Sequence, residues 1–441
     1  MVATVSKQLL GPEDGFSDED FVSKYVSNNF SIASRMRVSL DRFSKPAKDF
    51  YEPMGNETSC YIKGTDFKAS TLAGSCVCHN DYRGKDCGIP QRIWESQIES
   101  HFNTVTNKYI RYNWQDTLKR RQGNQRRLIH ALPVNLELDL FEARVATLYD
   151  VVDVFLIGES NMTNSGGSRE LSFHKLLQSG WLKPYHDKIV YVFRGVPPPK
   201  GFDDGVYADA YMRFHLTRKG FKHLLDLRDD DLFMYTDGDE LPRPEVLQFF
   251  KLYEGWPQPV AFQYKWSIYG FFWQVDGKVY GAYSRPIPSL VTMDVLRLVY
   301  DDDSSLIRRV SYYKTGKDVA PTSKNLTLYG RPIDQMSVID AGWHCSWCFS
   351  PEGIRAKLLD APNSDFPRFG DDRARTNVAY IRRLIKHGLY FSLVRVRKGG
   401  EVNSTFDAEY APPFIQRYPE KYSHLLFNPY QNVALPRSHR K

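Results

Sequence analysis

The sequence predicts an α/β fold built around a largely parallel sheet. Four short apolar runs have the length and composition of buried strands: residues 128–134, 151–157, 189–193 and 232–235. Longer amphipathic segments between them predict helices, at residues 138–148 and 208–227. Strands that alternate with helices indicate crossover connections, which join parallel strands in one sheet. In such sheets, ligands bind beyond the carboxyl ends of the strands, so the residues that follow each strand are candidate site residues.

Length and composition limit the possible classes of protein. The chain has 441 residues, which corresponds to two or three domains at about 100–200 residues each. Hydrophobic residues make up 42% and charged residues 25%, so an entirely disordered chain is excluded. The formal net charge of +7 is too small for this length to predict a nucleic-acid partner. No apolar run reaches the roughly 18 residues of a membrane-spanning helix, and residues 1–21 lack the apolar core of a signal peptide.

The cysteines indicate an oxidising compartment. Four lie close together, Cys60, Cys76, Cys78 and Cys87, and two lie far downstream, Cys345 and Cys348. A small segment cannot build its own core and needs covalent bridges, which persist outside reducing compartments. The alternative for the first group is a zinc site with His79 as an added ligand, but zinc sites usually present two separated ligand pairs. For the downstream pair we expect a structural disulfide, because no surrounding pattern supports thioredoxin-type chemistry.

Sequons agree with that compartment. Five N-x-S/T motifs occur, at Asn29, Asn56, Asn161, Asn325 and Asn403. Between the cysteine group and the first predicted strand, residues 91–118 carry apolar side chains near helical spacing and predict a connecting helix. The basic stretch 119–127 predicts a solvated linker.

An acidic motif directly follows the fourth predicted strand. Asp237 and Asp239 come just after residues 232–235, so their carboxylates are expected in the ligand crevice. Two positions apart in a turn, both can reach one hard cation, and Gly238 between them leaves room for a diphosphate. Carboxylates with open positions suit Mn²⁺ or Mg²⁺ bridged to phosphates. The alternative is an acidic turn that caps a helix starting near Pro244.

Further motifs occur downstream in a recognisable order. They are DGDELP (237–242), FKLYEGW (250–256), YGFFW (269–273) and AGWHCSWCF (341–349). Upstream of them, Cys76 and Cys78 are followed by Gly84 and Cys87. Taken together, these motifs resemble the bisecting N-acetylglucosaminyltransferase family over about residues 56–431.

The resemblance implies a domain organisation. It predicts a GT-A-type nucleotide-sugar transferase fold with a small N-terminal EGF-like disulfide module, in which Cys60 pairs with Cys76 and Cys78 with Cys87. We expect these segments: a stem or loosely ordered lead-in (1–55), the EGF-like module (56–90), a connecting helix and basic linker (91–126), the catalytic domain (127–432) and a tail (433–441). The family also implies a Golgi location with membrane association, although this sequence shows no anchor.

The implied reaction moves N-acetylglucosamine from UDP-N-acetylglucosamine in β-1,4 linkage to the core mannose of N-glycans on glycoproteins. The donor sugar is α-linked and the product β-linked, so the anomeric carbon inverts and a carboxylate has to take the proton of the acceptor hydroxyl. Asp371 is the expected base, with Asp372 and Glu352 as alternatives, or Asp371 caps a helix that begins near Arg373. Asp239 and Glu240 complete the expected catalytic residues.

The remaining candidate residues surround the donor. In many GT-A-type enzymes a downstream histidine completes the metal site, so His344 joins Asp237 and Asp239 as an expected ligand of Mn²⁺ or Mg²⁺. Glu137, Asp139 and Arg144 follow the first strand, where such enzymes hold uracil and ribose, although a helix N-terminus rich in acids accounts for them equally well. For Asp209 and Arg213, one helical turn apart, we expect a simple ion pair.

Two other functions remain open. The chain can be a transferase of the same family with a different glycan acceptor. It can also be a non-catalytic extracellular binding protein that uses the cysteine module, but that function leaves the strand–helix alternation unexplained.

Overall fold

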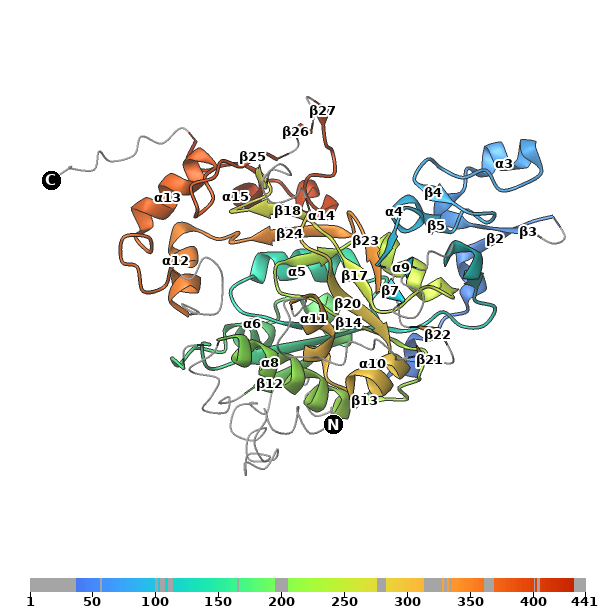
Figure 1. Cartoon of the computed structure of the whole chain (residues 1–441), viewed down its shortest axis with the longest axis horizontal. Coiled ribbons are helices and arrows are strands. Elements are labelled where there is room, and N and C mark those ends of the chain that lie inside the picture. The colour runs from blue at the N-terminus through green and yellow to red at the C-terminus, as the bar shows by residue number, and fades with distance from the viewer. Residues whose placement is uncertain are drawn as a thin grey trace.

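The structure is a computed structural model that describes most of the chain. The described residues are 37–55, 58–99, 102–103, 108–109, 114–164, 166–194, 205–275, 283–312, 327–328, 331–332, 335–360, 369–399, 401–402 and 405–431. They form a mixed α/β fold, which confirms the predicted class, with a large sheet at its centre (Figure 1). Within these residues, no helix combines the length and the apolar character that crossing a bilayer requires.

The four predicted strands lie side by side in the central sheet. Their spatial order is β12 (Ile189–Arg194), β11 (Val154–Ser160), β10 (Leu128–Pro133) and β14 (Leu232–Tyr235). All neighbouring pairs among them are parallel, as predicted. The sheet continues with β20 (Ile287–Thr292), β17 (Val260–Phe262), β23 (Gln335–Val338) and β6 (Gln97–Glu99). Because β20 is antiparallel to both β14 and β17, the complete sheet is mixed.

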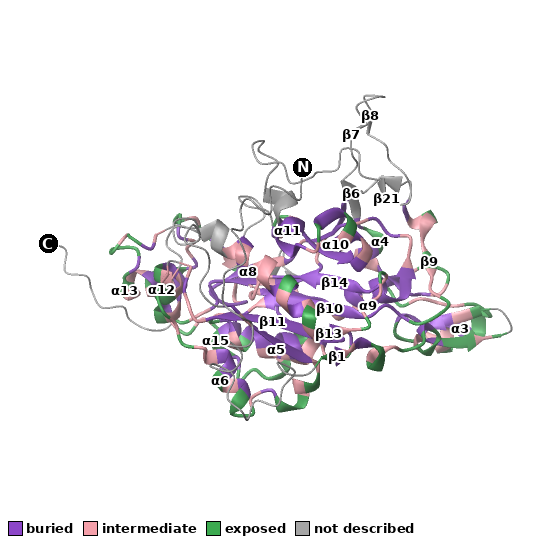
Figure 2. Cartoon of the chain, turned by 90° about the horizontal axis from the view of Figure 1, so that it is seen from below, coloured by how far each residue is buried: buried purple, intermediate pink, exposed green. Residues whose placement is uncertain are grey.

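Burial on both faces explains why these strands are continuous apolar runs in the sequence. On β10, Leu128 and Leu132 pack into one core cluster, and Ile129 and Ala131 pack into another. Successive strand residues point to opposite faces, so the two clusters lie on opposite sides of the sheet. The first cluster includes residues of α5 (Leu138–Leu148), α6 (Ser172–Gln178) and α9 (Pro244–Leu252). The second includes residues of α8 (Gly205–Gly220), α10 (Met293–Tyr300) and α11 (Ser304–Tyr312) (Figure 2).

The predicted helices agree with the structure to different degrees. The bounds of α5 match the prediction, and α9 begins at Pro244, where a helix start was expected. By contrast, α8 ends at Gly220, before the predicted end at residue 227. The chain leaves the helix there because Leu224–Leu225 form β13, which pairs with β1 (Val38–Ser39).

A second sheet adjoins the central one. Its strand order is β15 (Glu240–Pro242), β24 (Gly342–Ser346), β18 (Lys265–Ile268), β19 (Trp273–Gln274) and β25 (Arg397–Lys398). Three strands of the central sheet continue into it through short links: β14 into β15, β17 into β18, and β23 into β24. The last two links bind each other, because the Gln263 amide donates to the Val338 carbonyl and the Ala341 amide to the Gln263 carbonyl, both at 2.9 Å. The first link is the acidic motif, which therefore lies between the two sheets.

Short helices cover the second sheet. They are α12 (Pro351–Asp360), α13 (Val378–His387), α14 (Pro413–Arg417) and α15 (Ser423–Leu426). Two further core clusters form here: α14 and α15 contribute to one, together with Trp343 of β24, and α12 and α13 contribute to the other, together with Ile268 of β18.

The cysteine pairs expected from the resemblance are present. Cys60 is bonded to Cys76 and Cys78 to Cys87, and Cys345 is bonded to Cys348. Gly84 adopts φ +92°, which a residue with a side chain rarely does, and its carbonyl accepts from the Cys87 amide at 3.3 Å. Gly84 thus makes the tight turn before the last cysteine of the module.

The cysteine module packs against the rest of the chain. The Tyr253 hydroxyl, at the end of α9, donates to Asp86 at 2.7 Å. A Cβ at Gly88 would lie 2.0 Å from that hydroxyl, so only glycine allows this close approach.

In the N-terminal region, the described residues depart from the expectations at three points. Residues 37–55 are no loose lead-in, because Leu40 is fully buried in a core cluster and Asp41 pairs with Arg127 at 2.6 Å. No continuous helix forms over the described residues of 91–118: α4 covers Gln91–Trp94, Gln97–Glu99 pair with β23 at the edge of the sheet, and a 3-10 helix covers Trp114–Thr117. The basic stretch 119–127 is only partly solvated, since Arg127 is buried and pairs with Asp231 at 2.6 Å.

Candidate active site

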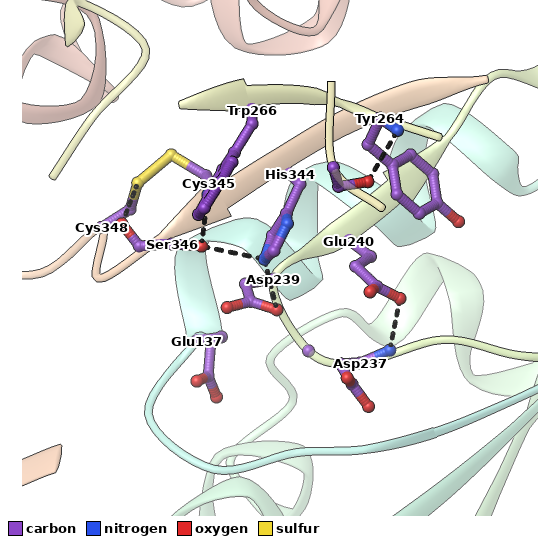
Figure 3. Close-up of polar contacts among 12 residues, drawn as sticks. Glu137, Asp237, Asp239, Glu240, Tyr264, Trp266, His344, Cys345, Ser346 and Cys348 are labelled. Atoms are coloured by element: carbon purple, nitrogen blue, oxygen red, sulfur yellow. Dashed lines mark hydrogen bonds and ion pairs between the residues drawn. A yellow bond between two sulfur atoms is a disulfide. The ribbon is translucent and has the colours of Figure 1, made fainter. Parts of the chain in front are cut away.

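The acidic motif forms a loop at the carboxyl end of β14. Tyr235 ends β14, and Glu240 begins β15 after Thr236, Asp237, Gly238 and Asp239. In the second sheet, Glu240 lies opposite His344 of β24, and the Cys345 amide donates to the Asp239 carbonyl at 2.9 Å. The register of β15 against β24 therefore brings together the acidic motif and the downstream histidine motif, as the resemblance implied (Figure 3).

Asp239 and His344 face each other. Asp239 Oδ1 lies 3.5 Å from His344 Nε2, and Asp239 Oδ2 lies 3.8 Å from Lys357 Nζ of α12. Burial opposes the ionisation of Asp239, but His344 and Lys357 outweigh it, so the pKa of Asp239 is well below its usual range. Burial also lowers the pKa of His344, but the Asp239 carboxylate outweighs it and raises that pKa above its ordinary value. The imidazole is further fixed by Ser346 Oγ at 3.0 Å and by stacking on Trp266.

Asp237 points away from His344 (Figure 3), and two arginines contact it. Arg308 Nη2 of α11 lies 2.5 Å from Asp237 Oδ2, and Arg213 Nη2 of α8 lies 3.3 Å from Asp237 Oδ1. Burial would raise the pKa of Asp237, but the two guanidinium groups outweigh it and lower the pKa. The expected ion pair between Arg213 and Asp209 also forms, at 2.5 Å.

Glu240 lies beneath the loop and is almost completely buried. Arg308 binds both of its carboxylate oxygens, with Nη1–Oε2 at 2.9 Å and Nη2–Oε1 at 3.1 Å. Oε2 also accepts from the Asp237 amide at 3.0 Å. With its carboxylate held in this way, Glu240 is placed to fix the loop rather than to touch a substrate.

Arg144 and Glu137 support the same loop, whereas Asp139 does not. Arg144 is buried in α5 and donates through Nη2 to the carbonyls of Asp237, at 2.8 Å, and Gly238, at 3.0 Å. A Cβ on Gly238 would lie 3.2 Å from Glu137 Oε2, and Glu137 pairs with Lys357 at 3.3 Å. Asp139 instead contacts His424 of α15 at 3.0 Å on an exposed surface.

The candidate bases lie on α12 and in the turn that precedes α13. Asp371 is exposed in a turn, and the helix that follows begins at Val378 with Asn377 as its cap, so Asp371 does not cap it. Within that turn, the Asp372 carboxylate accepts hydrogen bonds from the Ala374 amide at 2.9 Å and the Arg375 amide at 3.1 Å. Glu352 of α12 is exposed and lies 3.5 Å from Arg382.

The expected metal ligands are only partly assembled. In the described residues, no group of three or more His, Cys, Asp or Glu side chains is arranged to hold a metal ion. Asp239 and His344 converge and fit as two ligands, one an anionic oxygen and the other an imidazole nitrogen. Asp237 forms an ion pair with Arg308 and is not part of this pair of ligands.

Arg308 and Lys357 are the site residues that sequence reasoning missed. Arg308 lies 71 positions from Asp237, and Lys357 lies 220 positions from Glu137. Neither belongs to a motif, so no local signal in the sequence indicates them. Their roles follow only from the packing of α11 and α12 beside the loop.

Comparison with known proteins shows what the chain is similar to. Residues 93–293, which include β10, β11, β12, β14 and the acidic loop, match the model of glycosyltransferase family 17. The chain is 37% identical over 371 residues to the beta-1,4-mannosyl-glycoprotein 4-beta-N-acetylglucosaminyltransferase of Homo sapiens. The resemblance found in the sequence is confirmed.

The corresponding proteins of Mus musculus and Rattus norvegicus are both 36% identical to the chain over 364 residues. The human alignment covers 82% of this chain and 63% of the relative, and the two rodent alignments cover 81% and 62%. The chain thus spans a little less than two thirds of the length of the curated relatives it matches.

Proposed function

We propose that this chain is an inverting glycosyltransferase that moves N-acetylglucosamine from UDP-N-acetylglucosamine in β-1,4 linkage to the core mannose of N-glycans. The observation that carries the proposal is the acidic loop at the carboxyl end of β14, held against His344 in a chain similar to transferases of that name. Ligands of open α/β sheets bind at this edge. The mixed α/β sheet is consistent with a GT-A-type fold for the proposed catalytic domain, 127–432, and the two N-terminal disulfides with an EGF-like module at 56–90.

In the proposed mechanism, the loop holds the donor diphosphate. Asp239 and His344 are the residues that would hold Mn²⁺ or Mg²⁺, which when bound neutralises charge that develops on the leaving diphosphate. Arg144 holds the carbonyls of the loop through hydrogen bonds. Gly238 has no side chain, which keeps the space between the loop backbone and Glu137 open. Asp371 is proposed to accept the proton of the acceptor hydroxyl, because inversion in one displacement requires a base on the acceptor side.

The proposed acceptors are N-glycans on glycoproteins in the secretory pathway. Three disulfides among the described residues support a compartment that is oxidising. A Golgi location with membrane association is proposed from the resemblance to the family.

A transfer assay tests the function. The full chain is incubated with radiolabelled UDP-N-acetylglucosamine, MnCl₂ and a biantennary N-glycan, and the product linkage is determined by NMR. We expect a β-1,4-linked sugar on the core mannose with the wild type, loss of transfer with Asp239→Ala, and unchanged transfer with Glu420→Ala, an exposed acid in another part of the chain. Transfer to a different position would assign another acceptor, and no transfer to any N-glycan would refute the proposal.

A further inference from the structure

A cavity lies away from the acidic loop, where the cysteine module meets the large sheet. Its volume is about 440 Å³, within the range of small-ligand sites. The module lines it with Asn80 and Asp81, α4 and the turn after it with Gln91 and Glu95, and the segments next to β20 and β24 with Tyr283 and Asp340. In Figure 1, α4 lies between the module strands β4 (Tyr82–Arg83) and β5 (Ile89–Pro90) and the edge of the large sheet.

The lining of this module cavity combines planar polar groups with the apolar side chain of Ile339 and the ring of Tyr283. The Asn80 amide offers both donors and acceptors, the Gln91 amide donates to Glu95, and the carboxylates of Asp81 and Glu95 accept hydrogen bonds. Gln91 Oε1 is buried and has no hydrogen-bond partner within the described part of the chain. A buried unpaired acceptor of this kind costs free energy unless a donor reaches it.

The charge around the cavity selects against anions. Arg92, in the lining, contacts Asp340 at 2.9 Å and Glu245 at 3.8 Å, and it also pairs with Glu409. Arg243 is shared between Asp340, at 3.1 Å, and Glu409, at 3.0 Å. Both cations are therefore neutralised by carboxylates, while Asp81 and Glu95 add further negative charge at the rim. A phosphate or nucleotide would be repelled here, whereas a neutral molecule rich in hydroxyl groups can pair with amides and carboxylates alike.

The module cavity is linked directly to the active site by one strand. Asp340 precedes β24, and His344 lies in the middle of the same strand. Because Asp340 itself lies in a turn, the four residues span at most about 13 Å. An oligosaccharide of a few sugars has a comparable length.

We propose that the module cavity binds a neutral pyranose of the acceptor oligosaccharide, at a distance from the mannose that receives the transferred sugar. This inference rests on the proposed function, because it takes an oligosaccharide as the acceptor. It gives the cysteine module a role in recognising the acceptor, in addition to its contacts with α9. The hydroxyl groups of the sugar pair with Asn80 and Asp81 on one side and Gln91 and Glu95 on the other.

The first test measures binding without any donor, so that it does not depend on transfer. A free biantennary N-glycan is titrated into the full chain and followed by saturation-transfer NMR and calorimetry. We expect the double variant Asn80→Ala/Asp81→Ala to weaken binding about tenfold, as the loss of one or two hydrogen bonds would. Both residues are exposed, so the fold should persist, and circular dichroism verifies this. Equal affinity in the wild type and the double variant, or no binding to the wild type, would overturn the proposal.

The second test separates this proposal from the proposed function. In the transfer assay, the double variant should raise the KM for the full N-glycan about tenfold and leave the KM for UDP-N-acetylglucosamine unchanged, while Glu420→Ala changes neither. If transfer occurs with the same acceptor KM in wild type and double variant, the cavity proposal fails and the function stands. If no transfer occurs but glycan binding is lost in the double variant, the function fails and the cavity is a glycan-binding site without a role in transfer.

A third measurement distinguishes a sugar from a basic polypeptide segment. The neutral variant Asp81→Asn/Glu95→Gln keeps the size and polarity of both side chains and removes their charge. We expect this variant to bind the free N-glycan within about threefold of the wild type, because most hydrogen-bonding positions are retained. An arginine-rich peptide serves as the competing ligand. If the wild type binds this peptide but not the glycan, and if both salt and the neutral variant abolish peptide binding, the cavity binds a polypeptide and the proposal is overturned.

Discussion

Replacing Arg308 tests whether a buried charge network fixes the acidic loop. Arg308 binds both oxygens of Glu240, whose side chain is only 1% exposed, and it also holds Asp237. Arg308→Met would leave the Glu240 carboxylate buried without its cation. Breaking a buried ion pair in this way costs about 3–5 kcal/mol, so we expect the free energy of unfolding to fall by that amount. Urea denaturation followed by tryptophan fluorescence measures it.

A matched pair of variants separates this effect from lost packing. In Arg308→Met/Glu240→Gln the buried charge is removed together with its partner, so most of the lost stability should return. The expected coupling free energy is about 2 kcal/mol or more, within the range for residues in direct contact. The free energy of unfolding of Arg308→Lys should lie between those of the wild type and Arg308→Met, because lysine keeps the charge but cannot bind both oxygens of the carboxylate as arginine does. If Arg308→Met costs less than about 1 kcal/mol, or if the coupling is close to zero, the network does not stabilise the loop.

Three further changes test the site and the module. Asp239→Ala should abolish turnover with an unchanged circular dichroism spectrum, and EDTA should do the same to the wild type; full activity in EDTA would remove the metal from the proposal. Asp371→Asn should lose most of its kcat while it binds UDP normally by calorimetry, and retained turnover would move the base to Asp372 or Glu352. Cys87→Ser should lower the free energy of unfolding by about 2–5 kcal/mol, because it removes the bridge to Cys78. Unchanged stability in that variant, or free thiols at both positions by mass spectrometry of the mature protein, would contradict this account.

Elements buried on two faces were predictable from the sequence. β14 was found with its observed bounds because Leu232–Tyr235 are all buried and form an uninterrupted apolar run. The segment after Trp94 was mistaken for a helix because its apolar residues happen to follow helical spacing. Its actual conformation is set by pairing of Ile98 with Met336, far along the chain, and no local pattern reveals such a pairing.

In the candidate site, too, residues in local motifs were predictable, and residues placed by distant packing were not. Asp239 and His344 each belong to a motif, so the sequence indicated both before the register of β15 against β24 showed them facing each other. Arg308 was missed because its role depends on where α11 packs. Asp139 was placed at the donor because it follows the first strand, but the direction of its side chain, toward His424, depends on the docking of α15.

The three short links between the two sheets have a consequence for cooperativity. β14, β17 and β23 each continue into the second sheet within a few residues. Unfolding of either sheet therefore displaces three strands of the other. The hydrogen bonds of Gln263 to Val338 and Ala341 add to this coupling. Amide hydrogens of β24 and β14 should therefore exchange with similar protection, in one sub-global opening. The strand that carries His344 is then as rigid as the strand that leads to Asp237. The acidic loop and His344 therefore keep their distance from each other until both sheets open together.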